Sequence, residues 1–200
     1  MPVDTEPVAD VKQVLAALGP LPPPRGRPAL VIVSGLPGTG KSLFCRELRR
    51  RAGVAILESD ALRKLLFPQP TYSGEESQRL FTAVHAAIER LLASGVSCAL
   101  DATNLKERHR EPLYAIAEKQ GAKLILVEVT APPEVVRRRL ESRTQDGAAR
   151  SDADIAVYER MRREREEIPQ EHYLVDTTVD MGPVLAAIGR DLAATQGGVS

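Results

Sequence analysis

The sequence predicts an α/β fold in which a five-stranded parallel sheet lies between two layers of helices. Five short apolar segments alternate with helical segments along the 200 residues, and this alternation is the order that a doubly wound parallel sheet requires. The first apolar segment runs directly into a glycine-rich turn and then into a helix. A chain of this length suits one domain with a full core, with or without a small appendage.

Each strand and helix is expected from its own spacing of apolar residues. Short apolar runs, several of them rich in β-branched residues, predict strands at 29–34, 54–57, 96–100, 123–129 and 172–176. Apolar residues at helical spacing, with suitable residues at the ends, predict helices at 41–52, 61–66, 75–93, 106–120, from 134 to a loop at 145–151, then 152–167 and 183–194.

The first 28 residues are expected to form a helix and a stiff linker outside the main domain. Apolar residues recur at helical spacing over residues 7–18, and five prolines between 20 and 28 favour an extended connector. We therefore divide the chain into this N-terminal segment and a main domain at 29–196. Whether the N-terminal helix packs on the core or binds a partner is open at this point.

The turn at Gly35–Ser42, Gly-Leu-Pro-Gly-Thr-Gly-Lys-Ser, matches the P-loop pattern at every fixed position. Its glycines let successive backbone N–H groups converge on phosphate oxygens, and the dipole of the following helix favours negative charge there. Lys41 is expected to hold the β- and γ-phosphates of ATP, and the Ser42 hydroxyl to ligate Mg²⁺. The residues expected to bind the nucleotide are Gly35, Pro37, Gly38, Thr39, Gly40, Lys41, Ser42 and Leu43.

Acidic side chains follow two other strands at the edge where ligands lie in open α/β sheets. Asp101 follows an apolar strand, as does the carboxylate that holds the magnesium shell in P-loop proteins. Asp60 follows another strand and could accept the proton of an attacking hydroxyl, while Arg63, one helical turn away, holds the acceptor. Asp60 could also be the N-cap of the helix at 61–66, and the two roles are compatible.

An arginine-rich segment at about 137–165 is expected to form a helical lid over the phosphates. Between 134 and 167 there are nine arginines and nine acidic residues, so most of these side chains should form a solvated, salt-bridged surface. Arg139 and Arg143 lie four residues apart on one helix face, which favours them as the functional arginines.

The composition argues against several classes of protein. The chain has 27 basic and 27 acidic residues, so no net field attracts nucleic acid or a membrane, and the 4% aromatic content leaves few platforms for stacking bases. The two cysteines and three histidines lack the spacing of metal ligands. The sequence shows neither a signal peptide nor a membrane-spanning run, so we expect a cytoplasmic protein with no membrane partner and no obligate protein partner.

The order of these motifs resembles the P-loop phosphotransferases related to polynucleotide 5′-hydroxyl kinase, within a zeta-toxin-like, AAA-type ATP-binding family. The resemblance covers most of residues 29–177 and is greatest to a bacterial branch with an Asp-Ala-Thr-Asn motif and a Ser-Asp-Ala-Asp lid sequence. It is carried by Gly35–Ser42, Asp60-x-x-Arg63, Asp101-x-x-Asn104, Arg137–Arg143 and Ser151–Asp154.

The resemblance implies an ATP- and Mg²⁺-dependent kinase with Asp60 as general base. It places Arg63, Asn104 and Arg108 on the acceptor side and either Arg139 or Arg143 at the transition state. The acceptor is open between a 5′-hydroxyl nucleic acid end and a small molecule such as a sugar, an antibiotic or a nucleotide-sugar. A nucleotide-dependent switch is the less favoured class, since the Asp-x-x-Gly and Asn-Lys-x-Asp motifs of GTPases do not occur.

Overall fold

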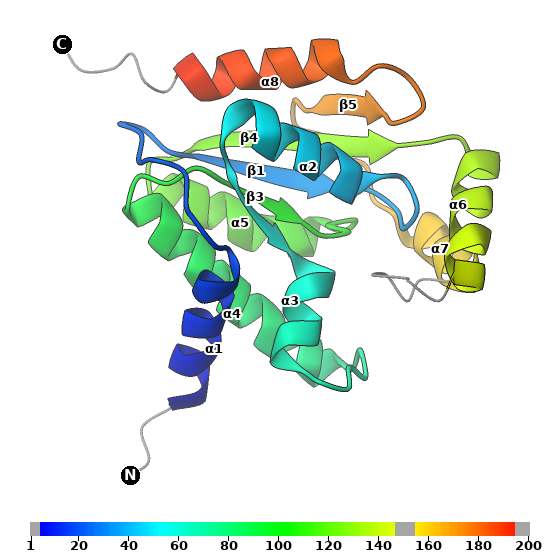
Figure 1. The fold of residues 1–200 in the computed structure, drawn as a ribbon, viewed down its shortest axis with the longest axis horizontal. Coiled ribbons are helices and arrows are strands. Elements are labelled where there is room, and N and C mark those ends of the chain that lie inside the picture. Colours follow the sequence, from blue (N-terminus) through cyan, green and yellow to red (C-terminus); the bar gives the residue numbers. More distant parts are fainter. Residues whose placement is uncertain (1–4, 147–154, 195–200) are drawn as a thin grey trace.

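The computed structural model describes residues 5–146 and 155–194 and contains one parallel sheet of five strands (Figure 1). The strands are β1 (Ala29–Ser34), β2 (Ala55–Glu58), β3 (Cys98–Asp101), β4 (Lys123–Thr130) and β5 (Tyr173–Asp176), in the order β2-β3-β1-β4-β5. All four pairings are parallel, and every strand begins or ends within two residues of its predicted bounds. The predicted α/β fold with a five-stranded parallel sheet is confirmed.

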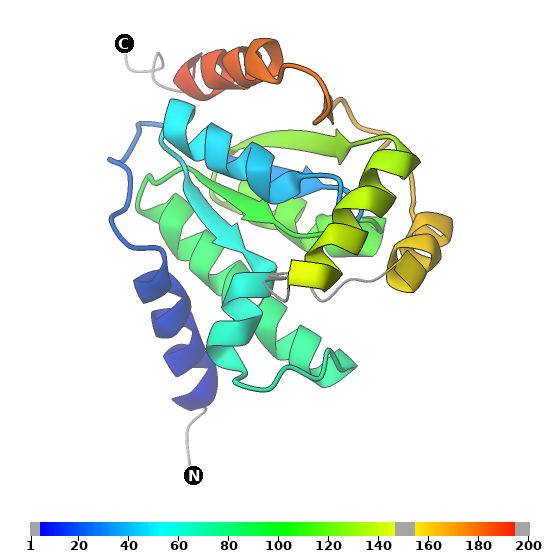
Figure 2. The same ribbon diagram turned by 45° about the vertical axis from the view of Figure 1, so that its right-hand side comes forward.

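The eight described helices also lie where the apolar spacing predicts them. They are α1 (Thr5–Ala17), α2 (Lys41–Ala52), α3 (Ser59–Leu66), α4 (Gly74–Ala93), α5 (Glu107–Lys119), α6 (Pro133–Asp146), α7 (Ile155–Glu164) and α8 (Gly182–Ala194). Helices α2 and α8 cover one face of the sheet, and α4 and α5 cover the other (Figures 1 and 2). No helix in the described part of the chain is long and apolar enough to cross a membrane.

The central strand β1 contributes to a hydrophobic core on each side of the sheet. Its alternate residues Leu30 and Ile32 belong to the core that α4 covers, whereas Val31 and Val33 belong to the core that α2 and α8 cover. This division follows from the two-residue repeat of side-chain direction along a strand. Because both faces of β1 are buried, every residue of this strand is buried, and a continuous apolar run is what such a position requires.

Helix α1 packs on the outside of the first core, beside α4 and α3 (Figure 2). Val11 and Val14 are buried in the same hydrophobic cluster as Leu80 and Val84 of α4. The structure thus answers the question that the sequence leaves open about this helix, because its apolar face is buried against the chain itself.

Helices α6 and α7 form the described part of the expected lid and pack against the P-loop. A third hydrophobic cluster joins them to it, formed by Leu36, Leu105, Val136, Leu140 and Tyr158. The loop expected at 145–151 and the motif Ser151–Asp154 lie largely or wholly outside the described residues. The predicted arginine-rich helical segment is therefore present as two helices whose buried residues contact the loop below.

Candidate active site

The neighbouring strands β2, β3 and β1 end together at one edge of the sheet, and the P-loop follows β1. Val33 of β1 pairs with Asp101 of β3, and Asp101 pairs with Glu58 at the end of β2. Asp60 lies two residues beyond Glu58, in the first turn of α3. The register of the sheet thus gathers Asp101, Glu58 and Asp60 beside the loop that follows β1.

Neighbouring elements enclose the P-loop so closely that its glycines are sterically required. A Cβ atom on Gly35 would overlap the Val129 carbonyl oxygen, and one on Gly38 would lie 2.9 Å from Val136 Cγ1. Gly38 also has a φ of 80°, a region that L-residues rarely adopt. The loop is held from outside by β4 and α6, which fixes the turn whose backbone N–H groups suit phosphate oxygens.

A lysine, a serine and a buried carboxylate meet where this loop enters α2. Lys41 Nζ donates to the Leu36 carbonyl oxygen at 3.0 Å, and the Ser42 hydroxyl donates to the Asp101 carboxylate. Burial raises the pKa of Asp101, whereas the Lys41 charge and the Ser42 hydrogen bond lower it. These contacts bring together three of the side chains expected at the phosphates and the metal.

One oxygen of Asp101 lacks a hydrogen bond. The residue is only 4% exposed, and its Oδ2 atom is buried with no hydrogen-bond partner in the described part of the chain. Leaving a buried carboxylate oxygen unpaired is costly. Mg²⁺ is bound through one or two protein oxygens together with phosphates and water, so Asp101 and Ser42 are a donor set that fits this ion.

The carboxylates near the loop share one electrostatic environment. The thiol of Cys45 on α2 is buried; burial and Asp101 raise its pKa, Lys41 lowers it and Glu58 raises it. From the sequence, Glu58 is placed on the same side of the sheet as the site, and no role is predicted for it. Its signal is the sheet register, since the last residue of β2 must lie beside Asp101.

The interpretation of Asp60 as an N-cap is wrong. Helix α3 begins at Ser59, so the N-cap is Glu58, which makes no side-chain capping bond, and Asp60 lies within the first turn. Its side chain is half-buried. An acid in the first turn of a helix is favoured by the helix dipole, and this position leaves Asp60 at the site edge of the sheet.

Arg63 is held inside the corner between α3 and α4. The residue is 6% exposed, its Nη1 atom lies 2.6 Å from Glu76 Oε1, and its Nη2 atom donates to the Ser77 hydroxyl at 3.2 Å. Burial by itself would raise the pKa of Glu76, but hydrogen bonds from Arg63 and Thr71 bring it down to about 2. Arg63 therefore lies on α3 as expected, but its guanidinium is ion-paired within the protein.

Asn104 and Arg108, the other two residues expected on the acceptor side, differ in burial: Asn104 is buried and Arg108 is exposed. Asn104 is 3% exposed and its Nδ2 atom donates to the Val33 carbonyl oxygen at 3.0 Å, which ties the loop after β3 to β1. Arg108 is exposed on α5, with its Nε atom 3.4 Å from His109 Nε2. Asn104 thus supports the base of the P-loop, and Arg108 lies on the surface of α5.

Arg110 is a buried cation whose importance sequence reasoning missed. It is 0% exposed; its Nη2 atom lies 2.6 Å from Glu107 Oε2, and its Nη1 atom donates to the Asn104 carbonyl oxygen at 2.9 Å. Nη2 also donates to the carbonyl oxygen of Glu167, 3.1 Å away in the segment after α7. From the sequence, the only indication of an ion pair at Arg110 is the acidic residue three positions earlier on the same helix face. That spacing does not show that the Arg110 side chain is buried.

Of the two lid arginines, Arg139 contacts the carbonyl side of the P-loop. Its Nη1 atom donates to the carbonyl oxygens of Gly38 at 3.3 Å and Thr39 at 3.2 Å, and to the Thr177 hydroxyl at 2.9 Å. The backbone of Arg143 lies in α6, and its side chain is outside the described atoms.

The model of a protein family described as an AAA domain, AAA_33, matches residues 30–168 of this chain. The chain belongs to this AAA domain family. Its fold and its P-loop are those of a P-loop kinase-like nucleotide-binding domain. Helix α1 precedes the matched residues.

One curated relative of this AAA domain is the protein KTI12 homolog of Mus musculus. The two are 31% identical over 173 residues, which make up 82% of this chain and 48% of the relative. The chain thus spans about half the length of that protein.

Solved structures of other proteins share the fold. A candidate kinase from Chloroflexus aurantiacus has a TM-score of 0.68 and 23% identity over 84% of this chain and 97% of its own. Chaetomium thermophilum Kti12 in complex with ADP-AlF3 has a TM-score of 0.64 and 21% identity, over 84% and 100%. The Mycobacterium tuberculosis APS kinase CysC in complex with AMPPNP and APS has a TM-score of 0.58 and 21% identity, over 86% and 99%.

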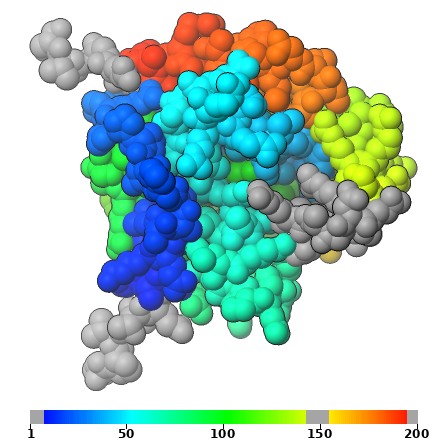
Figure 3. All heavy atoms as spheres, in the orientation of Figure 1, coloured from blue at the N-terminus to red at the C-terminus, as the bar shows by residue number. Residues whose placement is uncertain are grey.

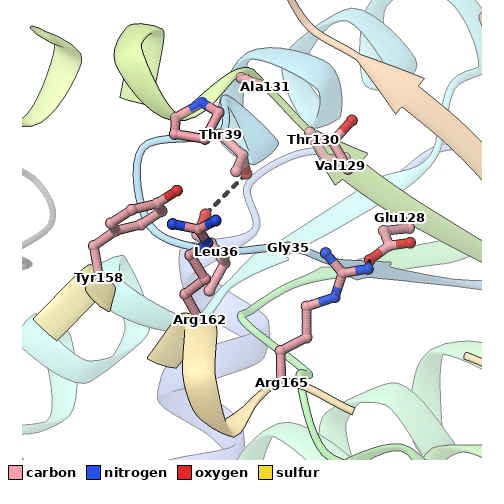
Figure 4. A pocket seen from close by; sticks show the side chains of 11 residues that line it. Gly35, Leu36, Thr39, Glu128, Val129, Thr130, Ala131, Tyr158, Arg162 and Arg165 are labelled. Atoms are coloured by element: carbon pink, nitrogen blue, oxygen red, sulfur yellow. Dashed lines mark hydrogen bonds and ion pairs between the residues drawn. The ribbon is translucent and has the colours of Figure 1, made fainter. Parts of the chain in front are cut away.

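A separate cavity of about 150 Å³ lies beside the P-loop of the AAA domain, on the side of β4 (Figure 4). Tyr158 and Arg162 of α7 border it, Thr39 donates to the Leu36 carbonyl oxygen at 2.8 Å in its wall, and Arg165 pairs with Glu128 at 2.8 Å. Its lining does not include Lys41 and Ser42 of the loop, nor the carboxylates Glu58, Asp60 and Asp101. This cavity therefore shares backbone of the P-loop with the edge where β1, β2 and β3 end, but not the charged side chains of that edge.

Proposed function

We propose that this protein is an ATP- and Mg²⁺-dependent kinase that transfers the γ-phosphoryl group of ATP to an acceptor hydroxyl, as polynucleotide 5′-hydroxyl kinases do. The observation that carries the proposal is the buried Asp101 Oδ2, which has no hydrogen-bond partner among the described residues and lies at the carboxylate that the Ser42 hydroxyl contacts. Asp60 follows the neighbouring strand at the same edge of the sheet.

The donor half of the reaction rests on the P-loop. Its backbone N–H groups and Lys41 hold the phosphates, and the lysine leaves the Leu36 carbonyl oxygen to do so. Ser42 and Asp101 would hold Mg²⁺, which would supply positive charge next to the phosphate oxygens. Nucleotides present in structures with the same fold, ADP-AlF3 in Kti12 and AMPPNP in CysC, support ATP as the donor.

The acceptor half rests on Asp60. The acceptor hydroxyl oxygen forms a bond to the γ-phosphorus, the bond from that phosphorus to the β,γ-bridging oxygen breaks, and ADP leaves. The hydroxyl proton passes to the Asp60 carboxylate. Arg139, which bonds to the backbone of Gly38 and Thr39, shapes the loop, and Arg143 stays the candidate for the transition-state arginine.

A small-molecule kinase is the second candidate, and the position of Arg63 favours it. A polynucleotide is held mainly through accessible cations that neutralise its phosphates. Arg63, expected on the acceptor side, is instead ion-paired with Glu76 and 6% exposed. A compact acceptor needs fewer phosphate contacts. The APS kinase structure with bound APS is an example of the same fold with a small acceptor.

The test is transfer of radiolabelled γ-phosphate from ATP to a panel containing a 5′-hydroxyl oligonucleotide, nucleosides, sugars and aminoglycosides. We expect one acceptor class to be labelled, and Asp60→Asn to lower transfer at least 100-fold while the Kd for ATP changes less than threefold. Glu111→Gln, an exposed acid on α5, is the control and should match the wild type. Equal transfer by Asp60→Asn and the wild type would refute the base assignment.

A further inference from the structure

We propose that Tyr72 is a stacking platform for an aromatic ring of the acceptor, so that the acceptor carries a nucleobase or a similar planar ring. The inference rests on the proposed function only for the transfer step, and the binding it describes can be measured without transfer. Tyr72 lies in the loop between α3 and α4 and is 43% exposed.

The backbone of Tyr72 is in a conformation that its side chain disfavours. Its φ is 56°, and in the described part of the chain Asn104 is the one other non-glycine residue with positive φ. Asparagine tolerates this region, whereas a bulky residue there is an outlier. Such outliers persist only where surrounding contacts over-determine them, and they gather at functional sites. Glycine or asparagine would adopt this conformation with less strain than tyrosine.

Glu76 supplies the contacts that hold the outlier in place. Its Oε2 atom accepts hydrogen bonds from the Thr71 N–H at 2.7 Å and the Thr71 hydroxyl at 2.9 Å, and its Oε1 atom accepts from the Tyr72 N–H at 3.3 Å. The Ser73 hydroxyl caps α4 by accepting from the Glu76 N–H at 3.2 Å. The loop is therefore fixed on both sides of Tyr72 before any ligand binds.

The guanidinium of Arg63 packs against the Tyr72 ring. The guanidinium carbon of Arg63 lies 4.8 Å from the centroid of the Tyr72 ring, within the range of a cation–π contact. The same guanidinium is ion-paired to Glu76, so its position is set independently of the tyrosine. The ring is thus oriented by a fixed planar cation, and a rigid aromatic surface binds a second ring at a low cost in conformational entropy.

The position of the ring suits an acceptor whose hydroxyl reaches Asp60. Arg63 follows Asp60 by three residues on α3, so the two side chains lie on one face of the helix, about one turn or 5 Å apart. Because the Tyr72 ring lies against Arg63, we expect a ring stacked on it to lie on the side of α3 that carries Arg63 and Asp60. Figure 3 shows a hollow between α2 and α3 on the face in view.

A single platform also agrees with the low aromatic content of the chain. Nonspecific binding of a long single strand uses successive aromatic residues, one for each base. One tyrosine suits one ring. A free nucleoside or nucleotide and the terminal base of a 5′-hydroxyl oligonucleotide share this chemistry, and the experiment below separates them.

The probe is 2-aminopurine riboside, whose fluorescence is quenched when it stacks, added to the full chain with its donor site saturated by AMPPNP and Mg²⁺. We expect saturable quenching by the wild type and by Tyr72→Phe, with Kd values within threefold of each other. Tyr72→Leu and Tyr72→Gly should raise the Kd at least tenfold. Leu174→Ala, an exposed apolar residue of β5, is the matched surface control.

Tyr72→Gly separates binding from stability. Glycine adopts a positive φ without strain, so this variant should melt no lower than the wild type while it loses the probe. Unchanged quenching in Tyr72→Gly and Tyr72→Leu, or no quenching by the wild type, would overturn the inference.

Transfer assays then distinguish this inference from the proposed function. Adenosine, ribose and a 5′-hydroxyl trinucleotide are compared as acceptors. If the wild type prefers adenosine to ribose, and this preference falls at least tenfold in Tyr72→Leu, the result supports the platform. The activity on the trinucleotide relative to adenosine then shows whether the stacked ring belongs to a free nucleoside or to the end of an oligonucleotide. If probe binding depends on Tyr72 but no acceptor is phosphorylated, the proposed function is refuted and the stacking platform is supported. Transfer to ribose and adenosine alike, unchanged in the variant, removes the platform and leaves the kinase.

Discussion

Asp10 of α1 accepts two hydrogen bonds from Arg79 of α4, at 2.7 and 3.0 Å. The aspartate is 3% exposed, and the guanidinium carbon of Arg79 lies 5.5 Å from the centroid of the Phe67 ring at the end of α3. One guanidinium thus connects α1, α4 and α3. Two of these helices enclose the loop that contains Tyr72, so α1 braces the side of the molecule that we assign to the acceptor.

Replacing Asp10 tests this brace. Asp10→Asn removes the charge opposite Arg79, whose side chain is partly exposed, so we expect a loss of about 1–2 kcal/mol in the free energy of unfolding. That loss corresponds to a melting temperature lower by about 2–8 °C for a chain of this size. Thermal unfolding followed by circular dichroism measures it. Lys12→Gln, at an exposed position of α1, is the control and should leave the melting temperature unchanged. If Asp10→Asn melts at the same temperature as this control, the Asp10–Arg79 contact does not stabilise the protein.

Asp101→Asn should separate stability from nucleotide binding. The buried Oδ2 atom of Asp101 has no donor in the described residues, so removing the charge should leave the melting temperature of the ligand-free protein unchanged or higher. The Mg²⁺-dependent gain in ATP affinity should fall at least tenfold, as measured by calorimetric titration with and without Mg²⁺. A variant that loses stability and keeps the Mg²⁺ effect would show that Asp101 has a structural role instead.

Glu76 predicts how stability depends on pH. Its pKa is about 2 in the folded protein, below the ordinary value of 4.5, so the unfolded chain binds the proton more readily. The stability contributed by this carboxylate is fully present above pH 4.5 and is lost as the pH falls toward 2. We expect the difference in urea midpoint between the wild type and Glu76→Gln to shrink over this window. Glu75→Gln, an exposed neighbour, should show no such convergence.

Gly38 and Gly53 provide a matched pair for testing contact between the P-loop and α6. Both have positive φ, but a Cβ atom on Gly53 meets nothing within 4 Å, whereas one on Gly38 would lie 2.9 Å from Val136. Gly53→Ala should cost about 1 kcal/mol of strain. Gly38→Ala should cost about 1–3 kcal/mol more and weaken ATP binding. Adding Val136→Ala should recover part of that ATP affinity, and a strictly additive double mutant would argue against the contact.

Arg139 is expected to act on ATP binding more than on transfer. Because its guanidinium bonds to the carbonyl oxygens of Gly38 and Thr39, Arg139→Lys should raise the KM for ATP several-fold and change kcat less than threefold. Arg138→Lys, an exposed neighbour, is the control. A large fall in kcat at unchanged KM would instead assign Arg139 to the transition state.

The sheet and the donor site could be predicted from the sequence because their signals are local. A continuous apolar strand ends at a glycine-rich turn, and the elements alternate at regular intervals, so Lys41, Ser42 and Asp101 fall into place once the strands are parallel. The burial of β1 on both faces follows from the same apolar run.

The acceptor side could not be predicted in the same way, since its contacts join residues distant in sequence. Arg63 is one helical turn from Asp60, but its partner Glu76 lies 13 residues away on another helix. Asn104 forms its hydrogen bond 71 residues away with β1, and Asp10 pairs 69 residues away with Arg79. Helix spacing shows which side chains share a face and does not show what covers that face.

The apolar cluster beneath α6 and α7 should make the contact between these helices and the P-loop depend on temperature. Leu36 of the P-loop is packed with Val136, Leu140 and Tyr158, so any separation of the helices from the loop exposes apolar surface to water. Exposing apolar surface to water increases the heat capacity. Apolar association, such as that between Leu36 and these helices, therefore weakens on cooling. We therefore expect cooling to weaken the contact between these helices and the P-loop.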